Sequence, residues 1–389
     1  MSHAIFCVIK RELQRMWQFK PYLATLTILP LCASLFFAAI FTKGTPRELP
    51  IVVTDMCHSQ LSRRVISMID ATPEISVEFE CDNIHECEQM VRSGRVGAMV
   101  VISPYFEKDI LGLHTTNIEA YISGTNILEN GLITKGLQSA IKTFSTGIQI
   151  QALSQQGLTQ RQALAQAIQI RFDEHILFNP YTNYSYYLSP SFISMMILIF
   201  TMLATIFAIG SELKHSTARD WIAAANGSIY KALIGKLTPI FLAMTLHALI
   251  MFVLLFEFVG VPLQGSFWVL AAGCEVFILS YMAVAVFIIS ITADMRLAMS
   301  LGGGYSVMAF SLSGLTFPTM AMHQGMQWIG HIFPFTYFTE IIIDQALRGA
   351  PIGNSLLQIS HMMLFLLLPL ATLTRLNKIT TNSHYWGRA

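Results

Sequence analysis

The chain has 389 residues and a formal net charge of +1, with 53% hydrophobic and only 12% charged residues. Soluble domains typically carry about 25% charged residues, so this composition excludes an ordinary water-soluble fold and indicates a membrane protein. Residues 43 to 190 contain 11 Lys and Arg against 15 Asp and Glu, a net charge of −4. This balance excludes the basic footprint of a nucleic-acid-binding protein.

Hydropathy predicts six transmembrane helices, the first separated from the other five by a long polar stretch. A spanning helix needs roughly 20 apolar residues at about 1.5 Å of rise each. The spans are expected at 22–42, 188–209, 234–258, 267–291, 297–315 and 355–374, the fifth being marginal in length. The predicted fold class is an α-helical polytopic membrane protein, arranged 1 + 5, with an inserted α/β extracytoplasmic domain at 43–187 and a five-helix transmembrane domain at 188–374.

The first span is interpreted as a permanent anchor and not as a cleaved secretory signal. Its apolar run is long, and no A-x-A cleavage site follows Phe41. Pro21 is expected to start the helix and Pro30 to kink it. The carbonyl that Pro30 leaves free should then bond to a neighbouring helix.

Both termini are predicted to be cytoplasmic. Lys and Arg in short loops are retained on the cytoplasmic side, and twelve of them fall on one face of this topology. That face would hold an amphipathic helix at 1–21 and a tail at 375–389. The cations are Lys10, Arg11, Arg15, Lys20, Lys214, Arg219, Lys231, Lys236, Arg296, Arg375, Lys378 and Arg388.

The polar stretch after the first span reads as a small β-α-β-α-β unit with one further strand. Strands are predicted at 49–55, 76–82, 96–103 and 118–123, and helices at 60–71 and 84–93. A long helical stretch follows from 127 to about 169, with a break near Gly157. Its apolar side chains indicate packing on its own domain, which we favour, or on a partner. They are Leu132, Leu137, Ile141, Phe144 and Ile148.

The cysteines and the sequence motifs indicate no catalytic or metal-binding site. Cys57, Cys81 and Cys87 fall in the predicted outer domain, where a bridge between Cys81 and Cys87 is one option that spacing alone cannot establish. No zinc pattern occurs. Gly235-Lys236-Leu237-Thr238 lacks the first glycine and the adjacent hydroxyl of a P-loop, so the chain is not expected to bind ATP itself.

Ionisable residues within predicted spans are candidates for function, because a charge in hydrocarbon is costly. Glu257 lies near a span end and is expected at the interface. Glu275 is deeper and either lines a path or is held by a hydrogen bond. His247 and His361 are expected to be packed core residues, and the glycine run 302–304 should let helices approach closely.

Two cytoplasmic segments are helix-capable and amphipathic. They are residues 4–20, with Trp17 at the membrane boundary, and residues 211–224, with Trp221. Each could lie in the lipid headgroups or could dock a cytoplasmic subunit.

Two further sets of residues form sequence motifs, in which the residue types follow one another in a recognisable order along the chain. The first consists of Glu212, Lys214, Thr217, Leu233, Gly235, Lys236 and Pro239. The second consists of Gly314-Leu-Thr-Phe-Pro318, Met322, Met326-Gln-Trp328, Pro334-Phe-Thr336 and Arg348-Gly349. Together, on a 1 + 5 layout, they resemble bacterial ABC transporter permeases of the type-2 exporter class. The chain departs from that pattern at Ser216, where the family often has glycine, and at His323, where proline usually follows the methionine.

The resemblance implies a half-transporter that pairs with a second copy or a paralogue and exports a drug-like, lipid or peptide substrate. A separate ATPase subunit would bind ATP, so this chain would have no catalytic residue, metal or cofactor of its own. Coupling to that subunit would involve Arg11, Arg15, Glu212, Lys214, His215, Thr217, Arg219 and Trp221. Segment 317–350 would be re-entrant, and the candidate substrate path would include Glu275, Gly303, Trp328 and Glu340. A periplasmic adaptor and an outer-membrane channel sometimes complete such exporters.

Two other classes stay open from the sequence. A proton-coupled transporter would use Glu275, Glu257 and the histidines, although no internal repeat is evident. A non-transporting scaffold or sensor would use the outer domain for binding and the helices as anchors.

Overall fold

The chain folds into two compact units in the computed structural model, which describes residues 2–41, 44–112, 114–167, 175–179, 182–315 and 317–387. One unit is formed by Met1–Gly44 with Ile176–Ala389, and the other by Thr45–His175. The predicted inserted domain ended at residue 187, but helix α9 already begins at Tyr184, after Asn183 caps it with a side-chain bond to the Ser185 amide. Arg388 and the expected helix end near Gln169 lie outside the described residues.

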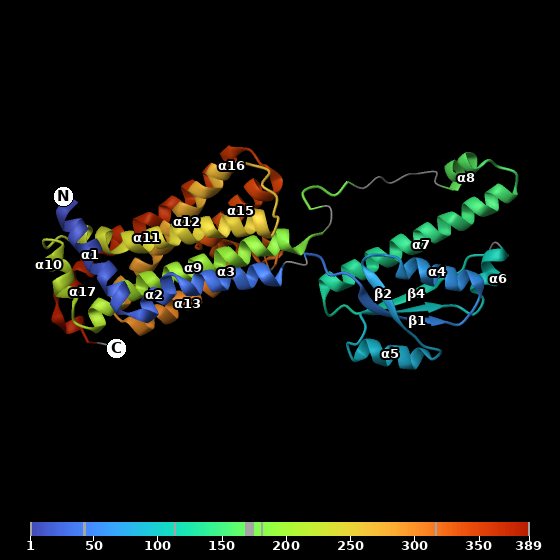
Figure 1. Ribbon diagram of the computed structural model, residues 1–389, viewed down its shortest axis with the longest axis horizontal. Helices are drawn as coiled ribbons and strands as arrows, with labels where there is room; N and C mark the ends of the chain where they lie inside the picture. The colour runs from blue at the N-terminus through green and yellow to red at the C-terminus, as the bar shows by residue number, and fades with distance from the viewer. Residues whose placement is uncertain are drawn as a thin grey trace. The chain divides into compact units, whose positions relative to one another are not determined.

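The smaller unit is a four-stranded sheet with helices on both faces. Its strands are β1 (Leu49–Asp55), β2 (Ile75–Glu80), β3 (Ala98–Ile102) and β4 (Ile118–Ile122). Its helices are α4 (Gln60–Asp70), α5 (Ile84–Arg92), α6 (Phe106–Leu111), α7 (Ile127–Gln155) and α8 (Gln160–Ala167). The strand order is β2-β1-β3-β4, and only β4 is antiparallel to its neighbour. Figure 1 shows α4 and α7 on one side of the sheet and α5 on the other.

The predicted β-α-β-α-β order and the additional strand are confirmed, whereas the short helix α6 was missed. Helix α7 ends at Gln155, and Gly157 follows with a φ of +93°, so the predicted break is confirmed. Leu132, Leu137 and Phe144 of α7 are buried against the sheet. The first half of α7 therefore packs on its own domain, while α8 folds back on α7 (Figure 1).

A disulfide joins Cys81 and Cys87 between β2 and α5, which settles the option left open by the spacing. Cys87 is buried, and the Thr54 hydroxyl lies 2.9 Å from its sulfur. Cys57 is a free thiol.

The larger unit is a helical bundle. Its N-terminal helices are α1 (Ser2–Gln18), α2 (Lys20–Leu26) and α3 (Ile28–Ile40). The long helices that follow are α9 (Tyr184–Lys214), α11 (Ile229–Val253, extended by a π-helical turn Leu254–Phe258), α12 (Phe267–Thr292), α13 (Met295–Ser311), α16 (Ile352–Leu364) and α17 (Leu368–Thr381). Short helices α10 (Ala218–Ala224), α14 (Gln324–Gly330) and α15 (Pro334–Ile342, extended by a π-helical turn Ile343–Arg348) connect them. Figure 1 shows α1, α10 and the end of α17 gathered at one end of this bundle.

Five helices among the described residues are long and apolar enough to cross a membrane. They are Lys20–Ile40, Tyr184–Lys214, Ile229–Phe258, Phe267–Thr292 and Ile352–Thr381. The marginal fifth span of the prediction corresponds to α13, which has 17 residues. The six-span count therefore stays a prediction.

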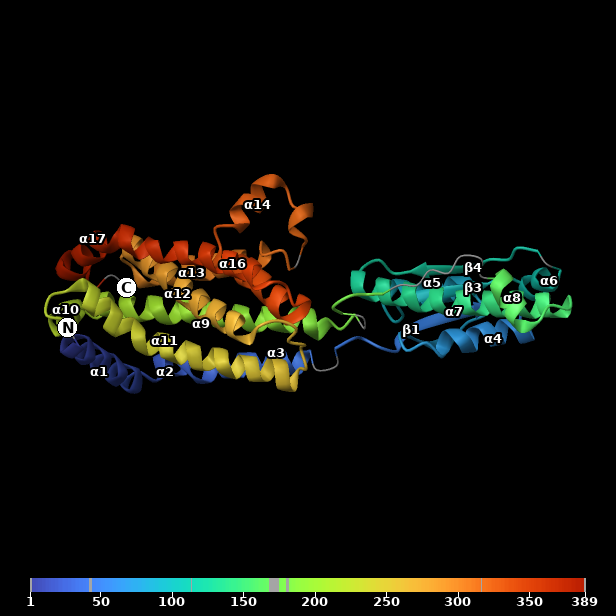
Figure 2. The ribbon, with the colours of Figure 1, turned by 90° about the horizontal axis from the view of Figure 1, so that it is seen from above.

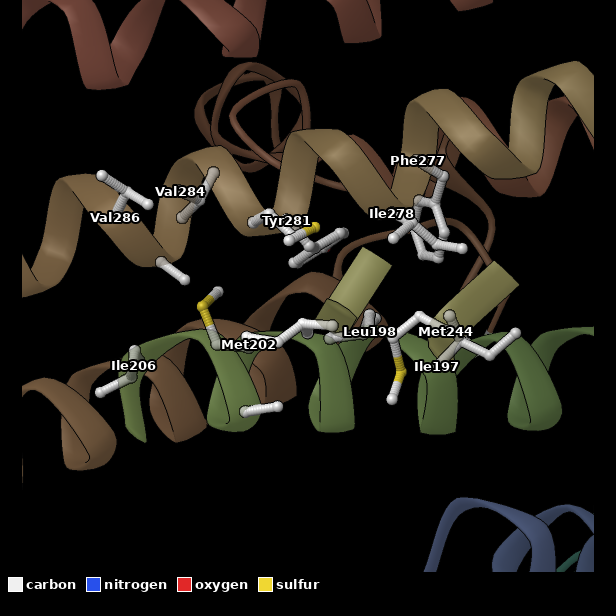
Figure 3. Close-up of a cluster of buried hydrophobic side chains, with 14 of the residues drawn as sticks. Ile197, Leu198, Met202, Ile206, Met244, Phe277, Ile278, Tyr281, Val284 and Val286 are labelled. Atoms are coloured by element: carbon white, nitrogen blue, oxygen red, sulfur yellow. The ribbon is translucent and has the colours of Figure 1, made fainter. Parts of the chain in front are cut away.

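The centre of the bundle is the contact between α9 and α12. Leu198, Met202 and Ile206 recur every four residues along one face of α9 and meet Ile278 and other apolar side chains of α12 (Figure 3). Helix α13 packs on the same α9, where a Cβ on Gly302 would lie 2.7 Å from Ile206. The expectation that glycines permit a close helix approach is thus confirmed at Gly302, while Gly303 and Gly304 face open space.

The first span is interrupted between α2 and α3 at Thr27. Pro30 has no N–H to offer to the carbonyl of Leu26, four residues earlier. The His247 Nε2 atom of α11 donates to that carbonyl at 2.8 Å. The prediction that a neighbouring helix satisfies the freed carbonyl is confirmed. This hydrogen bond gives His247 a structural role.

Segment 317–350 forms short helices, of which α14 stands out from the bundle in Figure 2. Five aromatic residues of this segment are of a type that predicts a place at the membrane interface, and for three of them this prediction is wrong; the five are Trp328, Phe333, Phe335, Tyr337 and Phe338. Phe333, Phe335 and Phe338 are at most 3% exposed, and Phe338 stacks on Phe277 of α12 with ring centroids 4.3 Å apart. Trp328 is 71% exposed. Phe335 and Phe338 are core residues that anchor this segment to Phe277 of α12, and Phe333 packs on Tyr305 of α13.

Candidate functional site

Helix α1 lies against α11 through one narrow stripe. Ala4, Val8, Glu12 and Met16 recur every four residues and are buried, so they share one face of the helix. A Cβ on Gly235 of α11 would lie 2.7 Å from the Val8 Cβ and clash with it. Glycine at this position therefore allows α1 to approach α11 closely.

Glu212, at the C-terminal end of α9, accepts hydrogen bonds from three segments. Arg11 donates to it through both guanidinium nitrogens, at 2.5 and 3.0 Å. Lys236 of α11 donates at 2.8 Å, and Arg15 and the Thr217 hydroxyl also donate. The Glu212 side chain is fully buried. One carboxylate thus joins α1, α9, the start of α10 and α11.

Lys236 and Glu12 form the inner part of the same network. The Lys236 Nζ atom lies 2.5 Å from Glu12, and both side chains are fully buried. The Tyr22 hydroxyl donates to Glu12 at 2.9 Å, and the Lys236 ammonium lies 4.9 Å from the centre of the Trp221 ring. We call Arg11, Glu12, Arg15, Glu212 and Lys236 the ion cluster; its formal charge is +1.

The charged members of the ion cluster depend on one another. Buried ion pairs often contribute little net stability compared with apolar packing, but removing one partner is strongly destabilising. Burial lowers the pKa of Arg11, yet the hydrogen bond and the negative charge of Glu212 outweigh this and raise the pKa above its usual value. The Arg11 guanidinium therefore stays charged, as its pairing with Glu212 requires.

Helix α10 is anchored on one side and exposed on the other. The indole Nε1 of Trp221 donates to the Ala232 carbonyl at 3.1 Å, and Trp221 is fully buried. Arg219, Asp220 and Ala223 are exposed. A short helix with this division can present a surface to another protein while its buried side transmits force to α9 and α11.

The C-terminal segment closes over the same end of the bundle. The Gly387 amide donates to the Leu213 carbonyl at 3.0 Å, and the Trp386 indole donates to the Ile379 carbonyl at 3.1 Å. A groove of about 440 Å³ lies between α10 and this segment, with Arg219 and Trp386 in its lining.

The structure brings together four of the eight residues predicted for coupling, namely Arg11, Arg15, Glu212 and Thr217. Trp221 lies beside them against Lys236. His215 and Arg219 are exposed, and Lys214 is half-buried.

Glu12 was missed as a site residue, and Lys236 was named as a cytoplasmic cation and as part of the family motif but not as a coupling residue. A carboxylate at the third position of the stripe formed by Ala4, Val8, Glu12 and Met16, which is otherwise apolar, was the available signal for Glu12. A Lys just inside the third predicted span was the corresponding signal for Lys236.

The residues predicted for a substrate path come from separate segments. Glu275 of α12 accepts a hydrogen bond from the Thr245 hydroxyl of α11 at 2.7 Å. Gly303 has open space beside it, and Trp328 and Glu340 are exposed. Among the described residues no hydrogen bond, ion pair or ring contact joins any two of these four. Across the same described ranges no three His, Cys, Asp or Glu side chains converge as a metal site.

Comparison with known proteins places the chain in a family. Residues 20–374 match the family described as ABC-2 family transporter protein. The chain is 22% identical over 335 residues to the inner membrane transport permease YhhJ of Escherichia coli K12, covering 84% of each protein. It is 19% identical over 353 residues to the probable multidrug ABC transporter permease YbhR of the same strain, covering 90% of this chain and 91% of the relative. No solved structure matches.

The family match covers most of the chain, including the helices that carry the ion cluster from Glu212 onward. The chain therefore belongs to the ABC-2 family of transporter proteins, and its predicted resemblance to ABC transporter permeases is confirmed.

Proposed function

We propose that this chain is the membrane-spanning subunit of an ATP-driven exporter in a bacterial inner membrane. Family membership supports the transporter role, and the name of the relative YhhJ supports the inner membrane. The observation that carries the proposal is the ion cluster, because it ties the helices at one end of the bundle into a single body.

A separate ATPase subunit would bind at this end. The exposed side of α10, with Arg219 and Asp220, would form the contact together with His215. Force applied there would pass through Trp221 to α11 and through Glu212 to α9 and α1, because each of these contacts is buried and hydrogen-bonded. Glu212 and Trp221 would then be positioning residues, and Arg219 and His215 would touch the partner.

The topology follows from the distribution of charge. With the cation-rich ends inside, the ion cluster and α10 face the cytoplasm and the α/β unit lies outside. The Cys81–Cys87 disulfide supports this orientation, since disulfides persist in oxidising compartments. A second copy or a paralogue would complete the transport path. The external unit would be available to a periplasmic adaptor and, through it, an outer-membrane channel.

The substrate class is a drug-like molecule, a lipid or a peptide. The name of the relative YbhR, a probable multidrug permease, favours the first. Helices α11, α12 and α17 line an open apolar pocket of about 300 Å³ that includes Phe241 and Met282, but such a lining suits all three classes.

The proposal is tested by purifying the tagged chain in mild detergent from its native cells and asking whether a P-loop ATPase accompanies it and hydrolyses ATP. Arg219→Ala should lower ATPase stimulation while the protein still inserts into the membrane. Arg296→Ala is the matched control, because Arg296 is exposed on the same predicted face but belongs to α13. Reproducible absence of an ATPase, or equal effects of both substitutions, would contradict the proposal.

A further inference from the structure

An open groove of about 510 Å³ lies beside the ion cluster, between α1 and the C-terminal half of α9. Arg11, Gln14 and Arg15 line it on the α1 side. The side chains of both arginines are 23% exposed, whereas the carboxylates that they contact, Glu12 and Glu212, are fully buried. The part of the ion cluster that a molecule in the groove can reach is therefore positive.

The positive charge beside the groove exceeds that of the carboxylates. The ion cluster holds three cations and two carboxylates, which leaves a formal charge of +1. Asp220 also acts on the charge of Arg11, but it is exposed on α10 and forms no ion pair with any described residue. Lys20 and Lys214 are chain neighbours of lining residues and add two further cations. An anion in the groove would balance this excess.

The lining changes from polar to apolar along the groove. Phe207, Ser211 and His215 line it at intervals of four residues, so they lie on one face of the α9 end. Ser211 accepts a hydrogen bond from Arg15 at 2.8 Å. One turn earlier in α9, Phe207 stacks on Phe19, with ring centroids 5.3 Å apart and an angle of 12° between the rings. Phe19 is 46% exposed and directly precedes the first membrane-competent helix.

A phospholipid has the same order of groups, with a phosphate above apolar chains. Guanidinium groups bind phosphate strongly, and each has five N–H groups, so the bonds to Glu212 and Ser211 leave donors for a further acceptor. In the proposed topology this end of the bundle meets the cytoplasmic leaflet, whose anionic lipids attract basic segments. Free phosphate or an acidic protein surface would match the charge but would leave the exposed ring of Phe19 unused. The charge and the rings together favour a lipid.

We propose that this groove binds one anionic phospholipid of the cytoplasmic leaflet. Its phosphate pairs with Arg11 and Arg15, and its acyl chains lie on Phe19 and Phe207. The bound lipid then joins α1 to α9 on the exposed side of the ion cluster. The inference rests on the proposed membrane topology, but it does not require the ATPase, because lipid binding can be measured on this chain alone.

The test uses the purified full chain in dodecyl maltoside, without an ATPase, and measures lipid retention by native mass spectrometry. The probes are dioleoylphosphatidylglycerol, which is anionic, and dioleoylphosphatidylcholine, which has the same acyl chains and no net charge. Gln14→Glu and Gln14→Lys change the charge at an exposed lining position outside the ion cluster. Asn377→Asp and Asn377→Lys are the matched controls, because Asn377 is exposed on α17 and does not line the groove.

We expect the first phosphatidylglycerol to bind at least about tenfold more tightly than phosphatidylcholine. Gln14→Glu should weaken phosphatidylglycerol about three- to tenfold, and Gln14→Lys should strengthen it by a similar factor. The Asn377 variants should bind like the unmodified chain. Equal affinity for the two lipids, or the absence of opposite effects from the two Gln14 substitutions, would overturn the site.

A competition experiment separates a lipid from a free anion. Inorganic phosphate should displace bound phosphatidylglycerol no better than chloride does at the same ionic strength, because phosphate has no apolar part to pack on Phe19. Displacement by phosphate but not by chloride would overturn the lipid as the occupant. All of these measurements are made without an ATPase, so they stand or fall separately from the proposed coupling.

Discussion

Glu212→Gln should weaken the attachment of α1 to the rest of the bundle without unfolding the protein. The substitution keeps the shape of the side chain but removes the negative charge that Arg11, Arg15 and Lys236 share. Glu12 then remains as the only carboxylate, and the formal charge of the ion cluster rises from +1 to +2. Three cations around one carboxylate repel each other in a site where Lys236 and Glu12 are fully buried and the two arginines are 23% exposed.

The magnitude follows from the partners that remain. Removing one partner of a buried ion pair costs about 3 to 5 kcal/mol. We take the lower end of this energy range, because two of the cations keep other partners. Arg15 keeps its hydrogen bond to the Ser211 hydroxyl at 2.8 Å, and Lys236 keeps its ion pair with Glu12 at 2.5 Å. A loss of about 3 kcal/mol raises the population of detached α1 by about 100-fold.

The assay is the labelling rate of a thiol placed on the buried face of α1. Ala4→Cys is suitable because Ala4 is 5% exposed, and Cys7→Ser removes the neighbouring thiol. The maleimide reaction should be about 100-fold faster with Glu212→Gln and unchanged with Asp220→Asn, an exposed carboxylate of α10. Equal rates in all three proteins would show that the ion cluster does not hold α1.

Three other outcomes are expected. His247→Phe leaves the carbonyl freed by the proline in the first span without a donor, so the free energy of unfolding in detergent should fall by about 1 to 3 kcal/mol, and an unchanged value would refute this. Cys81→Ser opens a short disulfide loop and should destabilise the α/β unit by about 2 kcal/mol in calorimetry of the full chain, whereas Cys57→Ser should not. A thiol introduced at Ser139 should react with an impermeant reagent from outside intact cells and one at Ser383 should not; reversed labelling would refute the topology.

The sequence predicted the elements whose signal is local. Long apolar runs identified the helices that can span a membrane, and alternating or continuous short runs identified the strands. Pro30 predicted both the interruption of the first span and the need for a hydrogen-bond donor from another helix. Both follow from the missing N–H of proline, which is a property of one residue. The start of α9 was placed four residues late, since Tyr and Ser at 184–187 are helical here but weakly apolar.

The ion cluster could not be predicted in the same way. Arg11 and Glu212 are 201 residues apart, and Lys236 and Glu12 are 224 apart, so no local pattern links them. The family motif identified Glu212 and Lys236 as related, but it gave no reason for their pairing. The buried role of Phe335 and Phe338 was missed for a similar reason, because an aromatic residue is equally common at a membrane interface and in a packed core.

The length of α9 has a consequence for where its charges reside. Its 31 residues extend for about 46 Å, whereas the hydrocarbon layer of a bilayer is about 30 Å thick. At least one end of this helix must therefore project beyond the lipid tails. Glu212 lies only two residues from the C-terminal end of α9. The paired charges can therefore be enclosed by protein at the level of the headgroups. The helix can then move as one rigid body without placing an ion in the hydrocarbon layer.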